Sequence, residues 1–265
     1  MKKKVVLEVG YIDKDKYERA KRLKWLDFKK INKTKVLVVG AGALGNEVCK
    51  NLVLSGFKNI SLVDMDYIVK SNLNRCILFT NLDAEKRRLK AVVVGERIKE
   101  IDDSVNIKCY TKKIEELGEK FIPAHDIVIG CVDNIATRLH LNAHCYYHRI
   151  PYIDGGMDGL IGKVQVVVPP KTSCIECNLN KTHMKILDLR FSCTGENITF
   201  FENKLAAEIT TTSIIAAIQV REALKLVNKC GEVIKHLLYY DGYRNVCDTL
   251  ELEINPNCMH HGKMK

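Results

Sequence analysis

The chain has 265 residues, with 42 Lys and Arg against 32 Asp and Glu, and its formal net charge at pH 7 is +10. This length suits one large α/β domain with a substantial core, and no apolar stretch reaches the roughly 18 to 20 residues that a membrane span requires. The basic residues are scattered without interleaved aromatic residues, so the charge favours a nucleotide or an acidic protein over nucleic acid as the partner.

The start of the chain and its cysteines indicate a cytoplasmic setting. The basic Met1-Lys-Lys-Lys4 is followed by a short apolar run that Glu8 interrupts, so we predict no secretory signal. In such a setting the eleven cysteines point to metal binding, a thiol nucleophile or burial, and away from disulfides.

Helices and strands alternate along the first part of the chain. The residue patterns predict helices at 11–30, 44–55, 84–101 and 134–147 and strands at 35–39, 59–63, 105–110 and 126–130. Such alternation is typical of an α/β fold with a doubly wound, Rossmann-like, mainly parallel sheet.

The pattern changes after residue 150. Glycines interrupt the β-type residues of 151–170, which predicts antiparallel pairing of these later strands. We expect a long loop at 178–204, one apolar helix at 204–227, and two strands within 234–254 around the turn Asp241-Gly242. No internal repeat or linker is evident, so a single domain with a β-rich extension fits best.

A glycine-rich turn, Gly40-Ala-Gly42-Ala-Leu-Gly45, directly follows the apolar strand at 35–39. Gly40 permits a tight turn, Gly42 lets the backbone approach a phosphate, and Gly45 lets the next helix pack closely on the strand. The free N–H groups of that helix favour an anion, and Asp64, at the end of the next strand, can accept both ribose hydroxyls. The turn therefore predicts a ribonucleotide, with a purely structural glycine turn as the alternative.

The polar loop after Asp64 is unlike that of a nicotinamide oxidoreductase. It brings Asn72 and Arg75 back toward the glycine turn, and Lys90 follows in the next helix. A pyrophosphate rarely needs two additional cations, whereas a triphosphate would suit them. A P-loop motif is absent from the sequence.

Asp133 follows the strand at 126–130 and has two interpretations. Its carboxylate could hold Mg²⁺ against phosphate oxygens, or it could cap the next helix. The spacing alone does not separate the two roles.

Two pairs of metal-ligand residues lie far apart in the sequence. Cys174 and Cys177 form one pair, and Cys258 and His261 form the other, each with two residues between its members. This spacing predicts a tetrahedral structural Zn²⁺ site, a zinc knuckle with no catalytic position. His260 could replace His261, and a redox pair or reactive thiols are the alternative.

Cys193 lies in the expected loop at 178–204. A cysteine in an exposed stretch can act as a nucleophile, and nearby cations would increase its thiolate fraction. An incidental thiol is the alternative that the local sequence leaves open.

Taken together, these motifs resemble the ubiquitin-activating enzyme superfamily, which includes the ThiF, MoeB and HesA adenylyltransferases. The resemblance runs from about residue 17 to 262. It rests on Gly40-x-Gly42-x-x-Gly45, Asp64-Met-Asp66, Asn72-Leu-Asn-Arg75, Leu89-Lys90-Ala91, Asp133-Asn134 with Arg138, Cys174-x-x-Cys177, and Tyr240-Asp241-Gly242 with Asn255-Pro-Asn-Cys258.

The resemblance implies ATP-dependent adenylation of a β-grasp protein that ends in Gly-Gly. Its carboxylate would attack the α-phosphorus and release pyrophosphate, and catalysis would consist of alignment and charge neutralisation. ATP would lie over the glycine turn, and its contacts would be Asp64 with the ribose, Asp66 with the adenosine or metal, Asn72, Arg75 and Lys90 with the phosphates, Asp133 with Mg²⁺, and Asn134 beside it.

The family also implies a dimer, in which Arg19 or Arg22 reaches the phosphates of the partner subunit. Cys193 would then accept the adenylated tail as a thioester, with a conjugating enzyme as a further partner. Two alternatives remain within the resemblance: a sulfur-carrier adenylyltransferase of MoeB or ThiF type, and a non-catalytic half of a heterodimeric activator.

We therefore predict one adenylation domain over residues 1–265. Its expected parts are an N-terminal helical segment at 1–33, a nucleotide-binding core at 34–170, the zinc knuckle and crossover loop at 171–204, and the C-terminal helix, hairpin and second zinc pair at 205–265.

Overall fold

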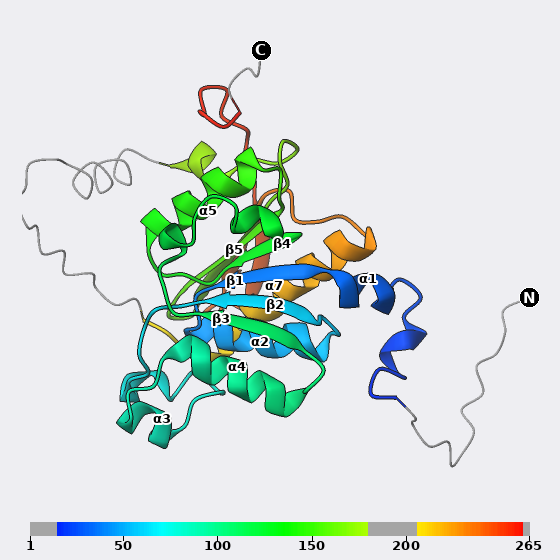
Figure 1. Ribbon diagram of the computed structural model, residues 1–265. Coiled ribbons are helices and arrows are strands. Elements are labelled where there is room, and N and C mark those ends of the chain that lie inside the picture. Colours follow the sequence, from blue (N-terminus) through cyan, green and yellow to red (C-terminus); the bar gives the residue numbers. More distant parts are fainter. Residues whose placement is uncertain (1–14, 180–205, 262–265) are drawn as a thin grey trace, which may run out of the picture.

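The computed structural model describes residues 15–179 and 206–261, and a single eight-stranded sheet runs through them (Figure 1). The strand order is β3-β2-β1-β4-β5-β6-β7-β8. The strands are β1 (Lys35–Val39), β2 (Asn59–Val63), β3 (Asn106–Tyr110), β4 (Ile127–Gly130), β5 (Tyr152–Asp158), β6 (Ile161–Val167), β7 (Leu237–Asp241) and β8 (Val246–Leu250). Strands β3, β2, β1, β4 and β5 are parallel to one another. Strands β6, β7 and β8 each pair antiparallel with the strand before them. The predicted doubly wound, Rossmann-like α/β fold with antiparallel C-terminal strands is confirmed.

Helices cover both faces of the parallel half of the sheet. The described α-helices are α1 (Phe28–Lys33), α2 (Ala43–Leu54), α3 (Asn81–Glu85), α4 (Lys90–Ile101), α5 (Ile135–Tyr147) and α7 (Ile209–Asn228). Short 3-10 turns are η1 (Ala20–Arg22), η2 (Lys70–Asn72), η3 (Ile114–Glu116), η4 (Ile122–Ala124) and η5 (Ile175–Asn178). Helices α2, α4 and α7 pack on one face, and α5 packs on the other (Figure 1).

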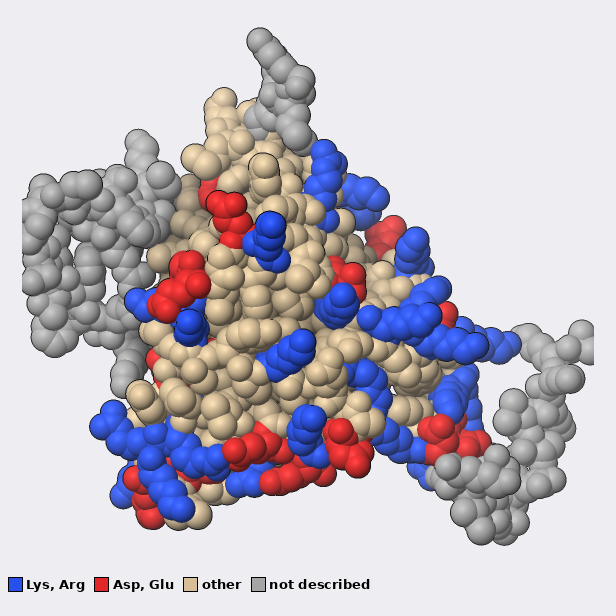
Figure 2. Space-filling model, in the orientation of Figure 1, with Lys and Arg blue, Asp and Glu red and all other residues tan. Residues whose placement is uncertain are grey.

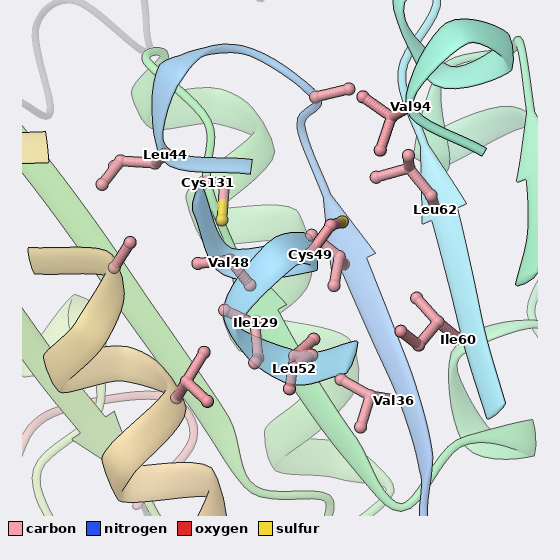
Figure 3. Packing of buried hydrophobic residues seen from close by; sticks show 14 of the residues in the cluster. Val36, Leu44, Val48, Cys49, Leu52, Ile60, Leu62, Val94, Ile129 and Cys131 are labelled. Carbon is pink, nitrogen blue, oxygen red and sulfur yellow. The ribbon is translucent and has the colours of Figure 1, made fainter. Parts of the chain in front are cut away.

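Strand β1 shows why this half of the sheet is covered on both sides. Val36 and Val38 enter the cluster beneath α2, whereas Leu37 and Val39 enter the cluster beneath α5. Successive side chains of a strand point to opposite faces, so a continuous apolar run requires cover on both. In Figure 3, α2 packs its Leu52 against the strands of the sheet.

The predicted helix at 11–30 is wrong for the described residues. Only η1 and α1 form there, because Leu23 is extended and Asp27 starts a new helix by accepting hydrogen bonds from the backbone N–H groups of Lys29 and Lys30. An N-cap carboxylate of this kind favours a fresh helix start over continuation of an earlier one.

The predicted helix at 84–101 is two helices. Helix α3 ends at Glu85, and Arg87 has a φ of +47°, a left-handed conformation that a continuous helix excludes. Leu89 is extended and α4 then begins at Lys90. This break places Lys90 in the first turn of a helix.

The later elements follow the prediction with shifted ends. Helix α7 begins at Ile209 because Glu208 caps it, and it continues to Asn228. The expected loop at 178–204 lies outside the described residues from position 180 onward. No helix of the described part of the chain is both long and apolar enough to cross a bilayer.

The charged residues are distributed over the surface. Figure 2 shows Lys and Arg interspersed with Asp and Glu on the visible face, most densely along the edge that α3 and α4 form. On this face the two signs are mixed, as the sequence predicts.

Candidate functional site

The glycine-rich turn joins β1 to α2 at the carboxyl end of the sheet. Gly40 has a φ of +99°, and a Cβ there would lie 2.4 Å from the carbonyl oxygen of Cys131. A Cβ at Gly45 would lie 1.9 Å from the carbonyl oxygen of Gly40, so both positions require glycine. A Cβ at Gly42, the N-cap of α2, would meet nothing within 4 Å. Space above the helix N-terminus is therefore open at Gly42.

Asp64 lies beside this turn and fixes its geometry. Its Oδ2 accepts a 2.6 Å hydrogen bond from the backbone N–H of Ala41, and its Oδ1 accepts one of 2.8 Å from the backbone N–H of Asp66. Burial raises the pKa of Asp64, and Lys90 and the two backbone donors oppose that rise. Each carboxylate oxygen retains a lone pair for a further donor such as a hydroxyl.

Lys90 contacts the carboxylate of Asp66, and the charge of Asp64 also acts on it. Its Nζ lies 2.7 Å from Oδ2 of Asp66, and its backbone N–H donates a 2.9 Å hydrogen bond to the carbonyl oxygen of Asp66. Burial lowers the pKa of Lys90, but Asp64 and Asp66 outweigh this effect and raise it. A cation in the first turn of a helix is unfavourable with respect to the helix dipole, so the carboxylates are what stabilise it there.

Arg75 and Asn72 belong to the loop that follows Asp64. Asn72 accepts a 3.0 Å hydrogen bond from the backbone N–H of Val69. The guanidinium of Arg75 donates to the carbonyl oxygen of Ser71 and, at 3.0 Å, to Oδ1 of Asn74. These contacts keep both side chains on their own loop.

The thiol of Cys76, the residue after Arg75, is buried and senses the charges around it. Burial raises the pKa of Cys76 to about 11, and the nearby charges of Arg75 and Lys90 oppose that rise. Asp64 acts on the same thiol with the opposite sign. The charges of Arg75, Lys90 and Asp64 thus all act on this one thiol, and the role of these residues in binding a nucleotide stays a prediction.

Asn46 was not among the predicted site residues, yet it connects the glycine turn to this loop. It is completely buried in α2. Its Nδ2 donates to the carbonyl oxygens of Ala41 at 2.8 Å and Gly42 at 3.0 Å, and its Oδ1 accepts from the backbone N–H of Leu78 at 3.0 Å. An amide side chain directly after the last glycine of the motif is the signal that could have identified it.

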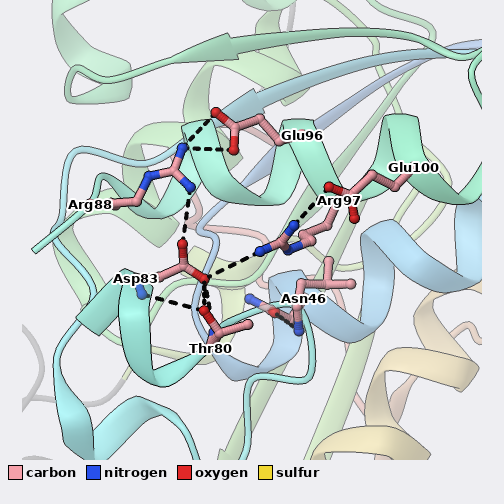
Figure 4. A network of polar contacts seen from close by, with 8 residues as sticks. Asn46, Thr80, Asp83, Arg88, Glu96, Arg97 and Glu100 are labelled. Carbon is pink, nitrogen blue, oxygen red and sulfur yellow. Dashed lines mark hydrogen bonds and ion pairs between the residues drawn. The ribbon is translucent and has the colours of Figure 1, made fainter. Parts of the chain in front are cut away.

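A polar network fixes the start of α4, which carries Lys90 (Figure 4). Asp83 is buried and accepts a hydrogen bond from Thr80 and a 3.0 Å ion pair from Arg88. Arg88 also binds Glu96 in α4, with both carboxylate oxygens within 2.7 Å of Nη2. The network therefore joins α3 to α4 on either side of the left-handed residue Arg87.

Asp133 and Asn134 have different roles at the end of β4. Asn134 is the N-cap of α5, and its Oδ1 accepts a 2.9 Å hydrogen bond from the backbone N–H of Thr137. The interpretation of Asp133 as the helix cap is therefore wrong. Asp133 is exposed, and its carboxylate is available at the carboxyl edge of the sheet.

Arg138 lies one turn into α5 and is buried against β5. It forms an ion pair with Asp154, which also accepts a 2.9 Å hydrogen bond from the hydroxyl of Tyr152. The guanidinium also donates to the carbonyl oxygens of Val132 at 2.6 Å and Gly155 at 2.9 Å. These bonds fix the backbone immediately before Asp133.

The predicted zinc ligands lie together, although 80 residues separate their two pairs in the sequence. The Sγ atoms of Cys174 and Cys177 are 3.8 Å apart, those of Cys174 and Cys258 are 3.6 Å apart, and Sγ of Cys177 lies 3.4 Å from Nδ1 of His261. All four ligand atoms lie within 4.8 Å of one another. Tetrahedral Zn²⁺ with Zn–S bonds of about 2.3 Å separates its sulfur ligands by about 3.8 Å, so the donor set fits this ion.

The structure distinguishes His261 from His260. Nε2 of His261 lies 3.1 Å from the carbonyl oxygen of Thr172, so it can donate its proton there and leave Nδ1 free as a ligand. Nε2 of His260 lies instead 2.8 Å from a carboxylate oxygen of Glu176. His261, and not His260, belongs to the four-residue cluster.

Two of the predicted catalytic residues, Cys193 and Arg19, are not placed near the glycine turn by the described part of the structure. Cys193 lies outside the described residues. Arg19 is exposed beside η1, in a segment attached near the amino end of the sheet, where Asn59 donates a 2.8 Å hydrogen bond to the carbonyl oxygen of Asn32. The glycine turn lies at the opposite, carboxyl end of the same strands.

Curated relatives match more than half of this chain. SUMO-activating enzyme subunit 2 of Dictyostelium discoideum is 41% identical over 152 residues, which cover 57% of this chain and 23% of the relative. The NEDD8-activating enzyme E1 catalytic subunit of Caenorhabditis elegans is 36% identical over 167 residues, which cover 58% of this chain and 38% of the relative. The chain thus spans less than two fifths of the length of either relative.

Solved structures share the fold at lower identity. Escherichia coli MccB with ATP has a TM-score of 0.76 and 22% identity, and the match covers 95% of this chain and 75% of MccB. The microcin C7 biosynthetic enzyme MccB in complex with N-formylated MccA has a TM-score of 0.77 and 21% identity, with coverages of 94% and 75%. These likenesses establish the Rossmann-like architecture.

One family model extends over the glycine turn and over the three cysteines of the metal-ligand cluster. The ThiF family model matches residues 17–260, which is nearly the whole chain. The chain therefore belongs to the ThiF family.

Proposed function

We propose that this protein uses ATP to adenylate the C-terminal Gly-Gly carboxylate of a ubiquitin-like protein. The observation that carries the proposal is the position of Lys90, which lies in the first turn of α4 with its Nζ 2.7 Å from a carboxylate oxygen of Asp66 and under the influence of the Asp64 charge. A lysine that the helix dipole disfavours, held beside an open glycine turn, is well placed to bind the phosphates of a nucleotide. The membership of this chain in the ThiF family and its similarity to SUMO- and NEDD8-activating enzyme subunits support the same reaction.

The chain supplies separate groups for the separate parts of ATP. The open space at Gly42 and the N-terminus of α2 receive phosphate oxygens, and Asp64 accepts the ribose hydroxyls with its remaining lone pairs. Arg75 and Lys90 neutralise the phosphate chain, and Asn72, on the same loop as Arg75, contacts it.

The proposed Mg²⁺ is assigned to Asp133. Its carboxylate is exposed at the end of β4 and is not used to cap α5, and a carboxylate is a suitable oxygen ligand for this ion. When bound, Mg²⁺ would neutralise charge on the departing pyrophosphate. Asp66 accepts a 2.7 Å hydrogen bond from Nζ of Lys90 and would orient that lysine.

The reaction needs no general base from the protein. The attacking group is a carboxylate and already carries the electron pair that forms the new bond to the α-phosphorus. The bond from that phosphorus to the bridging oxygen breaks, and pyrophosphate leaves with the electron pair. The protein therefore contributes alignment and positive charge, which can provide most of the acceleration in such a site.

The zinc cluster has a structural role in this proposal. Its four ligands leave no open position for a substrate, and they join the residues after β6 to the end of the chain beyond β8. Zn²⁺ would therefore hold the antiparallel edge of the sheet against the α5 face.

The dimer and the later steps are part of the same proposal. Arg19, or Arg22 close behind it, lies at the amino end of the strands, away from the glycine turn of its own chain, so we infer that it serves the phosphates of a partner subunit in a homodimer. Cys193 would accept the tail as a thioester and pass it to a conjugating enzyme. A sulfur-carrier protein of the ThiF and MoeB pathways is the alternative recipient of the same adenylation step.

Pyrophosphate exchange tests the adenylation step. With ATP, Mg²⁺ and a candidate β-grasp protein ending in Gly-Gly, labelled pyrophosphate should enter ATP, and Asp133→Ala should abolish this exchange. The same candidate protein without its last glycine is the matched control and should support no exchange. Absence of exchange with every intact candidate from the source genome would overturn the proposal.

Cys193→Ala separates the thioester from adenylation. This variant should retain pyrophosphate exchange and lose any thiol-sensitive adduct on a non-reducing gel. An adduct that survives in Cys193→Ala would exclude Cys193 as the acceptor.

A further inference from the structure

Three histidines recur at helical spacing along α5. His140, His144 and His148, the last of them the C-cap, are four residues apart, so their side chains lie on one side of the helix, one turn after another. All three are half-buried. The residues of α5 that pack beneath the sheet, such as Leu141 and Cys145, lie on another side. The histidines therefore occupy a side of α5 that does not enter the core.

The rings of His140 and His144 are in contact. Their centroids are 4.4 Å apart and their planes are inclined by 43°. The centroids of His144 and His148 are farther apart, at 6.4 Å. Within residues 15–179 and 206–261, neither the His140 ring nor the His144 ring forms a hydrogen bond or an ion pair. The two closest imidazoles thus keep their nitrogen atoms for a ligand.

The separation of these two rings suits imidazoles that share one metal ion. Metal–nitrogen bonds of about 2.1 Å that meet at about 90° to 110° place the two ring centroids roughly 4.5 to 5.2 Å apart. Histidines at positions i and i+4 of a helix provide two ligands to Zn²⁺ in this way in metalloproteases. The pair in α5 therefore needs rotation of its side chains to bind an ion, and no movement of the helix backbone.

A carboxylate lies near the same side of α5. Thr137, one turn before His140, donates a 3.1 Å hydrogen bond from its hydroxyl to Oε1 of Glu115 in η3. Burial lowers the pKa of His140, the charge of His144 lowers it further, and Glu115 opposes the change only in part. A neutral imidazole is the form that binds a metal ion, and a nearby carboxylate offsets part of the charge that the ion brings.

The type of ligand atom selects the ion. Imidazole nitrogen suits Zn²⁺, Ni²⁺ and Cu²⁺, whereas Mg²⁺ prefers oxygen ligands. The pair also differs from the cysteine cluster, because two histidines leave several coordination positions for water. An ion held in this way exchanges with solvent, unlike one enclosed by four protein ligands.

We propose that His140 and His144 bind a divalent transition metal ion, with one imidazole nitrogen from each ring and water in the remaining positions. The proposed adenylation uses neither histidine, so this inference goes beyond that function and stands or falls without it. The ion would connect two successive turns of α5, the helix that begins directly after Asp133 and Asn134. Because only the folded helix brings the two rings together, binding would stabilise the fold.

Titration with Ni²⁺ tests the site directly. The protein is prepared without a histidine tag, saturated with Zn²⁺ and dialysed, and calorimetry then measures Ni²⁺ binding at neutral pH. One Ni²⁺ per chain should bind, and His140→Ala and His144→Ala should each weaken binding at least tenfold. His148→Ala is the matched control on the same side of α5 and should change the affinity less than threefold.

Two results of this titration would overturn the proposal. One is the absence of Ni²⁺ binding by the unmodified chain. The other is binding that survives both His140→Ala and His144→Ala, since the ion would then lie elsewhere. Melting temperatures of the two variants verify that a loss of binding is not a loss of the fold.

Zinc content and Mg²⁺ separate this site from the other metal sites proposed here. The zinc content of the protein should be the same before and after the titration, whereas Ni²⁺ uptake equal to the zinc released would place Ni²⁺ in the cysteine cluster and contradict the proposal. Excess Mg²⁺ should not compete with Ni²⁺. Competition by Mg²⁺ would indicate oxygen ligands and would contradict it as well.

Histidine footprinting locates the ion without any substitution. Diethyl pyrocarbonate modifies accessible imidazoles, and mass spectrometry measures the modification of each histidine. Ni²⁺ should protect His140 and His144 at least threefold. His236, a half-buried residue directly before β7, is the internal control and should react equally with and without Ni²⁺. Unchanged reactivity of both His140 and His144 would show that they do not bind the ion.

Discussion

Oδ2 of Asp64 and the backbone N–H of Ala41 are joined by a 2.6 Å hydrogen bond. This bond connects the end of β2 to the glycine turn after β1, so Asp64 and the turn already have a fixed relation before the proposed nucleotide binds. A site prepared in this way loses little conformational entropy when its ligand binds.

Gly42 and Gly45 should respond differently to the same added methyl group. Gly42→Ala should melt within a few degrees of the unmodified chain because its Cβ meets open space, yet it should weaken ATP binding because the methyl occupies the phosphate approach. Gly45→Ala should lower stability by several kcal/mol or prevent folding, since its Cβ overlaps the carbonyl of Gly40. Calorimetric melting and ATP titration measure both effects, and equal melting of the two variants would contradict this account.

Removing the Lys90 charge should impair catalysis much more than folding. Lys90→Met should reduce pyrophosphate exchange by about 10²-fold, as the loss of one preorganised charge contact does in other enzymes. Its fold should persist because the Asp83, Arg88 and Glu96 network still holds the start of α4. Lys99→Met, in the last turn of the same helix, is the control and should leave the exchange rate unchanged.

The two adjacent histidines should differ in metal content. Purified protein should contain one Zn²⁺ per chain, and His261→Ala should lower both the zinc content and the melting temperature. His260→Ala should retain the metal, because its ring faces Glu176 and not the cysteines. Metal analysis of the two variants decides the question, and a zinc-free unmodified protein would remove the assignment.

Glu208 should make the stability of α7 depend on pH. Its hydrogen bonds with Thr210 and Thr211 lower the pKa of Glu208 from 4.5 to about 2 in the folded chain. A carboxyl group whose pKa is lower in the folded state stabilises the fold at every pH above its pKa in the unfolded chain. That contribution is lost as the pH falls from about 4.5 toward 2. Glu208→Ala should therefore cost about 1 kcal/mol at pH 7.

The measurement is urea unfolding of Glu208→Ala and the unmodified chain at several pH values. The difference in unfolding free energy between the two should narrow as the pH falls below 4.5. A difference that stays constant down to pH 3 would show that the cap acts without its charge.

The parallel half of the sheet was predictable because its signals are local. The strand at 35–39, the glycine turn and the helix behind it follow from residues that are adjacent in the sequence, and their boundaries differ from the prediction by one residue or none. The break at Arg87 was not predictable, because it depends on Asp83 holding Arg88 in a network that reaches Glu96 eight residues later.

The candidate site was predictable in composition and only partly in geometry. The sequence supplies the residue types around the glycine turn that a nucleotide would need, and their role in binding one stays a prediction. The role of Asn46 depends on a hydrogen bond to Leu78, and the choice between His260 and His261 depends on a carbonyl at Thr172. Both are contacts between residues that are distant in the sequence, and the order of residues along the chain does not reveal such contacts.

The metal cluster also has a consequence for how the molecule unfolds. Its two ligand pairs close a covalently continuous loop that contains α7, β7 and β8, and a cross-link across such a long span restricts the unfolded chain strongly. With Zn²⁺ in place, the antiparallel edge should melt together with the parallel half as one cooperative unit. A chelator should release that edge first, so that one melting transition divides into two.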